Sequence, residues 1–364
     1  MCYVGFARSE GGIIDVAGNK NLNDSARNKH DEFYTQLSLI ENELRHYKAH
    51  FAGKTVLCNC DDPYESNFFK YFAINFNFLG IKKLIATCYM GSPIASTQLT
   101  LFDDELIEDK TTKTPHKIVI SEVDDYNCDG RIDLLDVEYL LRNKKNTLTR
   151  LQGDGDFRSE ECIVLLKQAD IVVTNPPFSL FRDYMAQLVE HNKDFLIIGN
   201  LNAVKYKEIL PLFMTDKVWL GNNSGHYWFK VPETYEEKST DFKIDESGQK
   251  WRRMGNICWF TNLDFEKRHE DMTLFRTYSP DIYPKYDDYD AIEVSKTADI
   301  PSDYGGVIGV PITFMTRHNP EQFSLIGVLN SGTGNEYDYA KAVVNGKQLY
   351  TRILIRRKQG EDEN

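Results

Sequence analysis

The chain has 364 residues, of which 41% are hydrophobic and 27% are charged, so it can bury one or two cores and is not a disordered polypeptide. Its longest apolar stretch, residues 72–81, is too short to span a bilayer, and the N-terminus lacks the apolar segment of a secretory signal. A net charge of −12 disfavours nucleic acid as a partner but does not exclude it, because binding depends on a local basic surface. We therefore expect a cytoplasmic protein with no membrane partner.

The seven cysteines indicate a reducing compartment. Their number is odd, and no C-x-x-C spacing occurs. Cys58 and Cys60 lie two positions apart on a predicted strand, and a reduced pair in the core explains this spacing better than two metal ligands. The eight histidines show no ligand spacing, so we predict no zinc site.

Hydrophobic periodicity predicts a strand–helix–strand unit near the N-terminus. Residues 1–28 read as an irregular segment, and residues 32–50 as an amphipathic helix. The unit that follows has a strand at 55–60, a helix at 66–79 and a second strand at 83–89. Such a βαβ unit implies a parallel sheet, in which ligands bind at the carboxyl ends of the strands.

Residues 125–136 follow the pattern of a calcium loop and lead into a predicted helix at 137–141. The candidate ligands are Asp125, Asn127, Asp129, Arg131 through its backbone carbonyl, Asp133 and Asp136, with Gly130 at the sharp turn. The closing ligand is aspartate where glutamate is usual, and there is one copy. The alternative is an Asx-rich loop that is capped by its own side chains. The sequence leaves a structural calcium ion and this alternative both open.

A second βαβ unit is predicted from a strand at 171–174, a helix at 180–190 and a strand at 195–199. Between the first strand and the helix stands Asn175-Pro176-Pro177-Phe178. Pro176 disfavours helical backbone at Asn175, and neither proline supplies an N–H group. The turn therefore presents an amide, a free carbonyl and an aromatic ring at the carboxyl edge of a sheet, which suits the binding of a planar amine. Both units together predict an α/β fold with one doubly wound sheet.

Beyond residue 204 the pattern changes to short strands. They are expected at 218–221, 226–231, 256–261, 307–314, 323–329 and 349–355, with a polar surface excursion over 233–249.

Five segments make the chain resemble the EcoRI-type adenine-N6 DNA methyltransferases, over about residues 29–358. They are K-H-D-E-F-Y-T-Q at 29–36, T-V-L-C-N-C-D-D-P at 55–63, G-D-G-D-F-R-S at 153–159, T-N-P-P-F-S-L-F at 174–181, and G-V-P-I-T-F with N-P-E-Q-F within 309–323. Their order is that of the γ-type amino methyltransferases. The resemblance implies a Rossmann-like methyltransferase domain at 29–262, containing the excursion 233–249, and a C-terminal target-recognition region at 263–364. It also implies S-adenosylmethionine as cofactor, double-stranded DNA as substrate, and a monomer that belongs to a restriction-modification system or acts alone.

The resemblance assigns catalysis to Asn175, Pro176, Pro177 and Phe178. Asn175 and the Pro176 carbonyl accept hydrogen bonds from the adenine amine, while Phe178 stacks on a base flipped out of the duplex. The lone pair of this amine is delocalised into the purine, so two acceptors stabilise the charge that develops during attack on the methyl group. In-line positioning supplies much of the remaining rate enhancement, and neither a metal nor a covalent intermediate is needed.

The resemblance assigns cofactor binding to Tyr34, Thr35, Cys58, Asn59, Asp61, Asp62, Asp156 and Phe157. Asp156 and Phe157 match the third-strand acid and ring that contact the cofactor adenine, and a surface turn is the alternative. For Tyr34 and Thr35 the alternative is a packing role at a helix N-terminus. The sequence departs from the family pattern twice. Cys58-Asn59-Cys60 stands where many methyltransferases carry glycines, and the second strand ends in Cys88-Tyr89 without the acid that commonly holds the ribose.

Candidates for DNA contact are Trp228, Lys230, Arg252 and Arg253, with core aromatics and solvated cations as the alternative. A methyltransferase of RNA or of protein glutamine remains open as a second enzymatic function. A catalytically silent DNA-binding module remains open as a function of another class, because the glycine-poor first motif is compatible with lost cofactor affinity.

Overall fold

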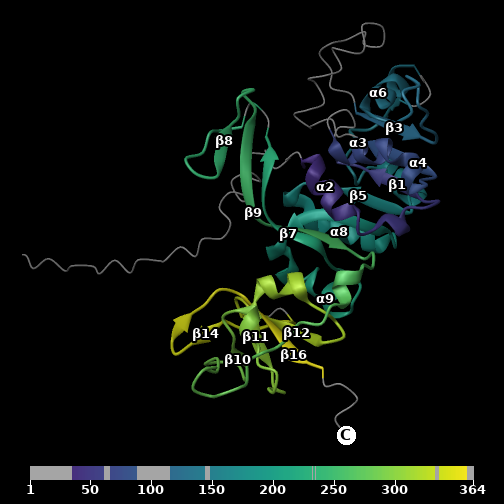
Figure 1. The fold of residues 1–364 in the computed structure, drawn as a ribbon. Helices are drawn as coiled ribbons and strands as arrows, with labels where there is room; N and C mark the ends of the chain where they lie inside the picture. The colour runs from purple at the N-terminus through teal and green to yellow at the C-terminus, as the bar shows by residue number, and fades with distance from the viewer. Residues whose placement is uncertain are drawn as a thin grey trace, which may run out of the picture.

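The computed structural model describes residues 35–60, 66–87, 115–143, 148–231, 233, 235–332 and 336–358. The described chain is a mixed α/β protein with a large mixed sheet, a five-stranded sheet and a two-stranded hairpin (Figure 1). Three residues predicted to bind the cofactor, Tyr34, Asp61 and Asp62, lie outside the described residues, as does the strand end Cys88-Tyr89.

The large sheet has nine strands in the order β4-β3-β2-β1-β5-β6-β9-β7, with β8 paired to β9. Its strands are β1 (Thr55–Cys58), β2 (Lys83–Thr87), β3 (His116–Ile120), β4 (Leu148–Arg150), β5 (Ile171–Thr174), β6 (Asp194–Asn200), β7 (Trp219–Lys230), β8 (Phe242–Ile244) and β9 (Lys250–Thr261). The four central strands β2, β1, β5 and β6 are parallel, as the two βαβ units predict. The outer strands are antiparallel to their neighbours.

Helices cover both faces of the central strands. The helices are α2 (Leu37–Leu44), α3 (Asn67–Ile74), α4 (Phe76–Leu79), α6 (Leu134–Asn143), α7 (Glu160–Gln168), α8 (Phe181–Glu190) and α9 (Leu210–Met214). Short 3-10 segments are η1 (Lys48–His50), η2 (Phe178–Leu180), η3 (Leu201–Lys205), η4 (Glu266–His269), η5 (Thr297–Asp299) and η6 (Ile312–Arg317). No helix in these described ranges is long and apolar enough to cross a membrane.

Alternate side chains of the central strands enter two different cores. In β5, Val172 packs with α7 and α8 on one face, whereas Val173 packs with α2 and α3 on the other. This follows from the two-residue period of a strand. The helix predicted over 66–79 is divided at Asn75, whose side-chain amide donates to the Tyr71 carbonyl at 2.9 Å and so competes with the helical backbone.

The strands β7, β8 and β9 form an arm that extends beyond the sheet. Asn200 at the end of β6 pairs with Ile257, so the first residues of β9 and the last of β7 continue past the carboxyl ends of the parallel strands. We define the arm as residues 226–256, and Figure 1 shows it projecting from the body of the protein. The polar excursion predicted at 233–249 contributes β8, which pairs with β9.

One continuous β7 replaces the two short strands predicted at 218–221 and 226–231. The register shifts between Leu220 and Ser224, where the polar sequence resembles a turn. Buried Glu43 of α2 accepts hydrogen bonds from the backbone N–H groups of Asn222 and Asn223 at 2.7 and 2.8 Å. This carboxyl group satisfies the backbone where the ladder is irregular, so the strand continues.

Burial raises the pKa of Glu43 from 4.5 to about 7, against the opposing effect of its hydrogen bonds. Because the folded pKa exceeds the unfolded one, the contribution of Glu43 to stability is greatest below pH 4.5 and is lost as the pH rises through about 7. We compare the free energy of unfolding of the wild type with that of Glu43→Gln. The difference between the two should fall by about 3 kcal/mol as the pH rises through this range, because glutamine does not titrate. Urea unfolding at several pH values measures it, and a pH-independent difference would contradict the prediction.

The C-terminal part of the chain forms the second sheet, in the order β10-β11-β16-β12-β13. Its strands are β10 (Ile292–Glu293), β11 (Ile308–Pro311), β12 (Phe323–Leu329), β13 (Asp338–Ala340) and β16 (Arg352–Arg357), and the hairpin is β14 (Val343–Val344) with β15 (Lys347–Gln348). Phe260 of the large sheet and Ile308 of the second belong to one hydrophobic core, which also includes residues of α9 and η6.

Candidate active site

The Asn-Pro-Pro-Phe turn lies directly after β5, as predicted. Asn175 and Pro176 are buried, while Pro177 and Phe178 are half-buried. Pro177 has φ −56° and ψ 123°, and its carbonyl accepts from the Leu180 backbone N–H at 3.0 Å, which starts the short helix η2. The turn therefore holds the Asn175 amide and the Pro176 carbonyl at the carboxyl end of a fully buried strand.

Two buried hydroxyl groups connect this turn to the end of β1. The Thr174 hydroxyl donates to the Asn59 backbone carbonyl, and the Tyr184 hydroxyl of α8 donates to the Asn59 side-chain oxygen. Thr174, Tyr184 and Asn59 are each at least 95% buried. The first and second predicted motifs thus meet at one edge of the sheet. Sequence reasoning missed Tyr184, which looks like one more apolar position of an amphipathic helix.

Asp156 and Phe157 approach the same edge from the loop after β4. Strand β4 is antiparallel to β3, which is antiparallel to β2, so β4 points in the same direction as the parallel strands. The Phe157 ring packs edge-on against Tyr184, with 5.0 Å between ring centroids, and it is only 6% exposed. Gln187 of α8 donates to the Phe157 carbonyl at 3.1 Å. Phe157 therefore forms part of the packed floor beneath this edge.

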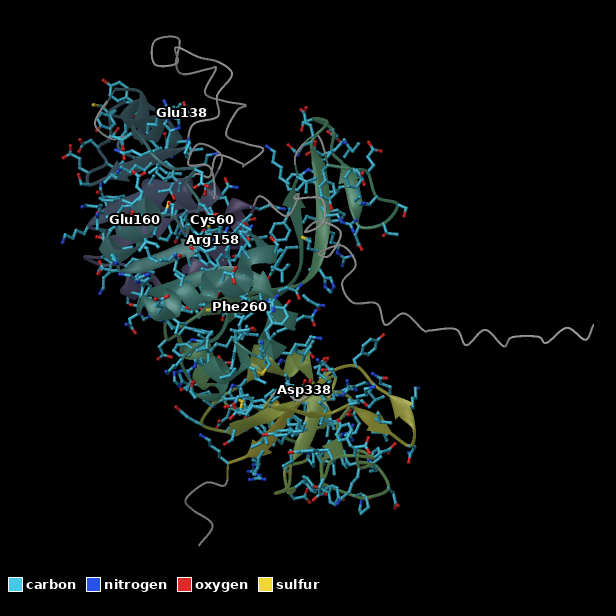
Figure 2. All side chains as sticks on the ribbon, turned by 180° about the vertical axis from the view of Figure 1, so that it is seen from behind. Cys60, Glu138, Arg158, Glu160, Phe260 and Asp338 are labelled. Carbon is cyan, nitrogen blue, oxygen red and sulfur yellow. The ribbon has the colours of Figure 1, made fainter. Side chains whose placement is uncertain are left out.

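The Asp156 carboxylate is held by Arg158, which donates from its Nε and terminal nitrogen at 2.9 and 2.7 Å. This guanidinium holds the pKa of Asp156 below its usual value. The carboxylate is therefore ionised at neutral pH. Arg158 and Cys60, both labelled in Figure 2, mark the loops after β4 and β1 that reach this edge.

Thr35 lies beside the start of α3, the helix that follows β1. Its carbonyl accepts from the side chain of Asn67, the first residue of α3, at 2.7 Å. The Thr35 hydroxyl is buried and has no hydrogen-bond partner among the described residues. A buried hydroxyl without a partner is costly in a folded protein, so this atom fits a site that a polar ligand completes.

The backbone after β1 adopts a glycine-like conformation without glycine. Cys60 has φ +74°, in the left-handed region that favours glycine. The first motif therefore departs from the usual methyltransferase pattern in residue type but keeps, at Cys60, a backbone conformation that favours glycine. Cys58, the other predicted cofactor residue here, is buried within β1 and faces the core of α2 and α3.

The predicted calcium loop is closed by its own side chains. Asp125 accepts from the backbone N–H groups of Asp129 and Gly130, at 3.2 and 2.7 Å. Asp136 accepts from the N–H groups of Tyr126, Asn127 and Asp133, and the N–H of Asp133 is the main cause of its lowered pKa. In the described part of the chain, no three His, Cys, Asp or Glu residues are grouped to hold a metal ion. These contacts match the capped Asx-rich loop, and calcium binding stays a prediction from the sequence.

The four predicted DNA contacts lie on the arm, in different environments. Arg252 is 1% exposed and donates to the backbone carbonyls of Thr240 and Asp241. Its guanidinium therefore fastens the arm and does not face solvent. Arg253 is exposed and lies 3.5 Å from the Asp241 carboxylate. Trp228 and Lys230 are half-buried, and Lys243 of β8 lies over the Trp228 ring at 4.7 Å.

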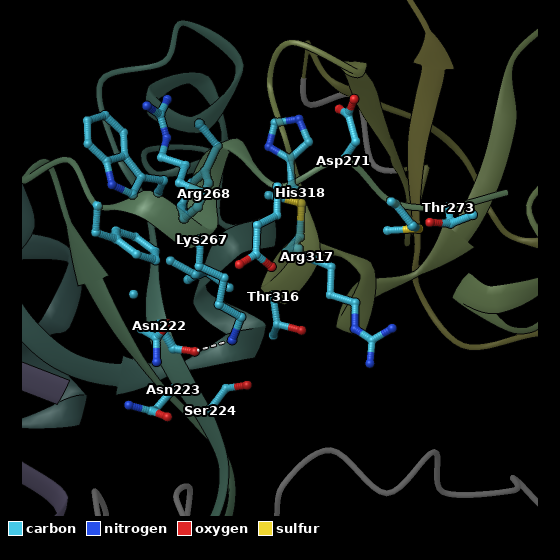
Figure 3. Close-up of a pocket in the computed structure, with 18 residues that line it drawn as sticks. Asn222, Asn223, Ser224, Lys267, Arg268, Asp271, Thr273, Thr316, Arg317 and His318 are labelled. Carbon is cyan, nitrogen blue, oxygen red and sulfur yellow. Dashed lines mark hydrogen bonds between the residues drawn. The ribbon is translucent and has the colours of Figure 1, made fainter. Parts of the chain in front are cut away.

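A separate cavity of about 660 Å³ lies between β7, η4 and η6. Figure 3 shows Lys267 bonded to the Asn222 carbonyl in this cavity, with Arg317 and Thr316 on the opposing wall. Arg268 forms another wall, where it stacks on Trp219 at 3.7 Å. None of the described residues predicted for catalysis or cofactor binding lines this cavity. The meeting of motifs at the sheet edge, and not the size of a cavity, locates the candidate active site.

Comparison with known proteins gives the family. The family model "Adenine-specific methyltransferase EcoRI" matches residues 21–358. The type II methyltransferase M.EcoRI of Escherichia coli is 45% identical over 347 residues, which cover 94% of this chain and 98% of that protein. The type II methyltransferases M.MgeORF184P of Mycoplasma genitalium and M.MpnI of Mycoplasma pneumoniae are each 36% identical, over 93% of this chain and 99% and 98% of theirs. No solved structure gave a significant match. The chain therefore belongs to the EcoRI family of adenine-specific methyltransferases.

Proposed function

We propose that this enzyme transfers a methyl group from S-adenosylmethionine to N6 of an adenine that is flipped out of a specific DNA duplex sequence. The observation that carries the proposal is the junction between the Asn175-Pro176 turn and the end of β1, made through Thr174 and Asn59. It brings a pair of acceptors for an amine next to the segment that the family resemblance assigns to the cofactor. The four parallel strands with helices on both faces support a Rossmann-like methyltransferase sheet.

In the proposed mechanism, Asn175 and Pro176 orient the reacting amine. The Asn175 side-chain oxygen and the Pro176 carbonyl accept the two amine N–H bonds, which localises the nitrogen lone pair. Both acceptors are held in a buried turn, so they need no reorganisation as positive charge develops on the nitrogen. Half-buried Phe178 offers an aromatic face for the flipped base. S-adenosylmethionine, when bound, supplies the electrophilic methyl group.

The residues near the end of β1 fit such a cofactor chemically. The buried Thr35 hydroxyl lacks a partner among the described residues, the Asp156 carboxylate is ionised, and the Asn59 amide is anchored. We assign Asn59 to the amino acid end of the cofactor and Asp156 to its adenine, with Phe157 supporting the site from below. Asp61 and Asp62, which follow β1 directly, belong to the same assignment.

We further propose a catalytic domain at 29–262 and a target-recognition region at 263–364. The second sheet, built from residues 292–357, supports this division. The arm extends beyond the sheet edge where the flipped base would enter. This position supports a role for the arm in binding DNA on the side of the catalytic turn. Of the arm residues, Trp228, Lys230 and exposed Arg253 are assigned to DNA, and buried Arg252 to the structure of the arm. The type II names of the relatives support a role in restriction-modification.

Sequencing the DNA of a host that expresses the chain tests this function. We expect N6-methyladenine at every copy of one short sequence, and far less at that sequence in a host that expresses Asn175→Ala. Methylation confined to RNA or to protein glutamine would favour the alternative enzymatic function. A purified protein that binds DNA but neither binds the cofactor nor methylates any substrate would indicate a catalytically silent module.

A further inference from the structure

Tyr184 of α8 contacts two segments assigned to the cofactor site without belonging to either. Its hydroxyl donates to the side-chain oxygen of Asn59, after β1, and its ring packs edge-on against Phe157, after β4. Tyr184 is 1% exposed. Burial raises the pKa of Tyr184 well above its usual value, so the hydroxyl stays protonated and acts as the donor. One side chain thus links two loops that are separated by almost a hundred positions.

The bond from Tyr184 goes to the oxygen end of the Asn59 amide. The Asn59 side-chain oxygen accepts from Tyr184, and its backbone carbonyl accepts from Thr174. An amide can turn over about its last torsion, and the bond from Tyr184 to its oxygen favours the orientation in this structure. That orientation presents the N–H groups, which suit an anionic ligand such as a carboxylate.

The backbone next to Asn59 makes this anchoring more important. Cys60 has a left-handed conformation that is unfavourable for a residue with a side chain. A glycine would adopt it without cost, so the turn after β1 needs other contacts to hold it. Tyr184 and Thr174 supply hydrogen bonds to the residue immediately before the turn.

We propose that Tyr184 is a positioning residue for cofactor binding, which acts by holding the Asn59 amide with its N–H groups directed at the carboxylate of S-adenosylmethionine. The inference rests on the proposed function and deepens it. Tyr184 itself touches no reacting atom. Its action through Asn59 distinguishes it from a residue that only stabilises the core.

Calorimetric titration of the purified full chain with S-adenosylhomocysteine tests the proposal without measuring activity. Tyr184→Phe removes the hydroxyl but keeps the ring on Phe157, and we expect about tenfold weaker binding with little change in melting temperature. Asn59→Ala should weaken binding at least as much. Because Tyr184 acts through Asn59, the double variant Tyr184→Phe/Asn59→Ala should bind as Asn59→Ala does.

Tyr283→Phe is the matched control, because it removes another buried tyrosine hydroxyl, one that donates to the Asp299 carbonyl at 2.8 Å in the C-terminal part. It should bind S-adenosylhomocysteine like the wild type. Unchanged affinity in Tyr184→Phe, or losses that add in the double variant, would overturn the role of Tyr184 and leave the proposed function intact. If Tyr184→Phe does not fold, unchanged affinity in Asn59→Ala overturns the proposal by itself. A wild-type chain that does not bind S-adenosylhomocysteine would instead overturn the proposed function.

Discussion

Replacing Asn175 by alanine is expected to lower the rate of methyl transfer by about 10²- to 10³-fold, while cofactor affinity remains unchanged. The side-chain oxygen of Asn175 is one of two acceptors proposed for the adenine amine, and it acts on charge that develops only as the reaction proceeds. Its loss should therefore lower the rate constant and not the affinity for the substrate. Single-turnover methylation of a duplex oligonucleotide, with enzyme and cofactor in excess, measures this rate constant directly.

Asn175→Asp is the matched variant, because it keeps an acceptor oxygen at the same place and is nearly isosteric. We expect it to retain more activity than Asn175→Ala, although the buried site disfavours an ionised carboxylate. Full activity in Asn175→Ala would reject the proposed catalytic role. Loss of cofactor binding in Asn175→Ala would show that Asn175 acts in the cofactor site and not on the target base.

Replacing Glu293 by alanine is expected to destabilise the C-terminal sheet by about 3–5 kcal/mol. Glu293 of β10 binds the Arg352 guanidinium of β16 through its two oxygens, with the shortest distance 2.8 Å. It also accepts from the hydroxyl groups of Tyr286 and Ser295. The Glu293 and Arg352 side chains are only 6% and 10% exposed, so alanine would leave a buried charge without its partner.

The functional consequence of Glu293→Ala tests the proposed division into domains. If residues 263–364 recognise the DNA target, this variant should lose affinity for its DNA sequence and keep its affinity for S-adenosylhomocysteine. Urea unfolding, DNA-binding titration and calorimetry measure the three quantities. Lys285→Ala is the control, since it removes an exposed ion pair with Asp290 from the same part of the chain and should change none of them. Normal sequence-specific DNA binding by a destabilised Glu293→Ala variant would contradict the division.

The sequence predicted the elements whose patterns are local. The strand at 171–174 is confirmed at both ends, because a short apolar run is bounded by a charged residue and by two prolines. The strand predicted at 323–329 is also confirmed at both ends. The continuous β7 could not be predicted from residues 218–231, because Glu43, almost 180 positions away, satisfies its irregular backbone.

In the candidate site, too, the sequence predicted features with a local pattern and missed those that depend on distant contacts. The Asn175-Pro176-Pro177-Phe178 turn is readable from sequence, because proline restricts the backbone of its neighbours wherever it occurs. The burial of Arg252 could not be predicted from the sequence. Two adjacent arginines look the same in sequence whether a guanidinium faces solvent or donates to two carbonyl groups, as that of Arg252 does.

By itself, the sequence determined that this protein has parallel βαβ units, an Asn-Pro-Pro-Phe turn at a strand end and the motif order of its family. Those features depend on residue type and on short spacings along the chain. Only the tertiary structure joined Asn59 to Tyr184, 125 positions apart. It also placed Cys60 in a glycine-like conformation and turned the strands β7 to β9 into an arm. Such contacts depend on how distant elements pack, and neither propensity nor spacing encodes them.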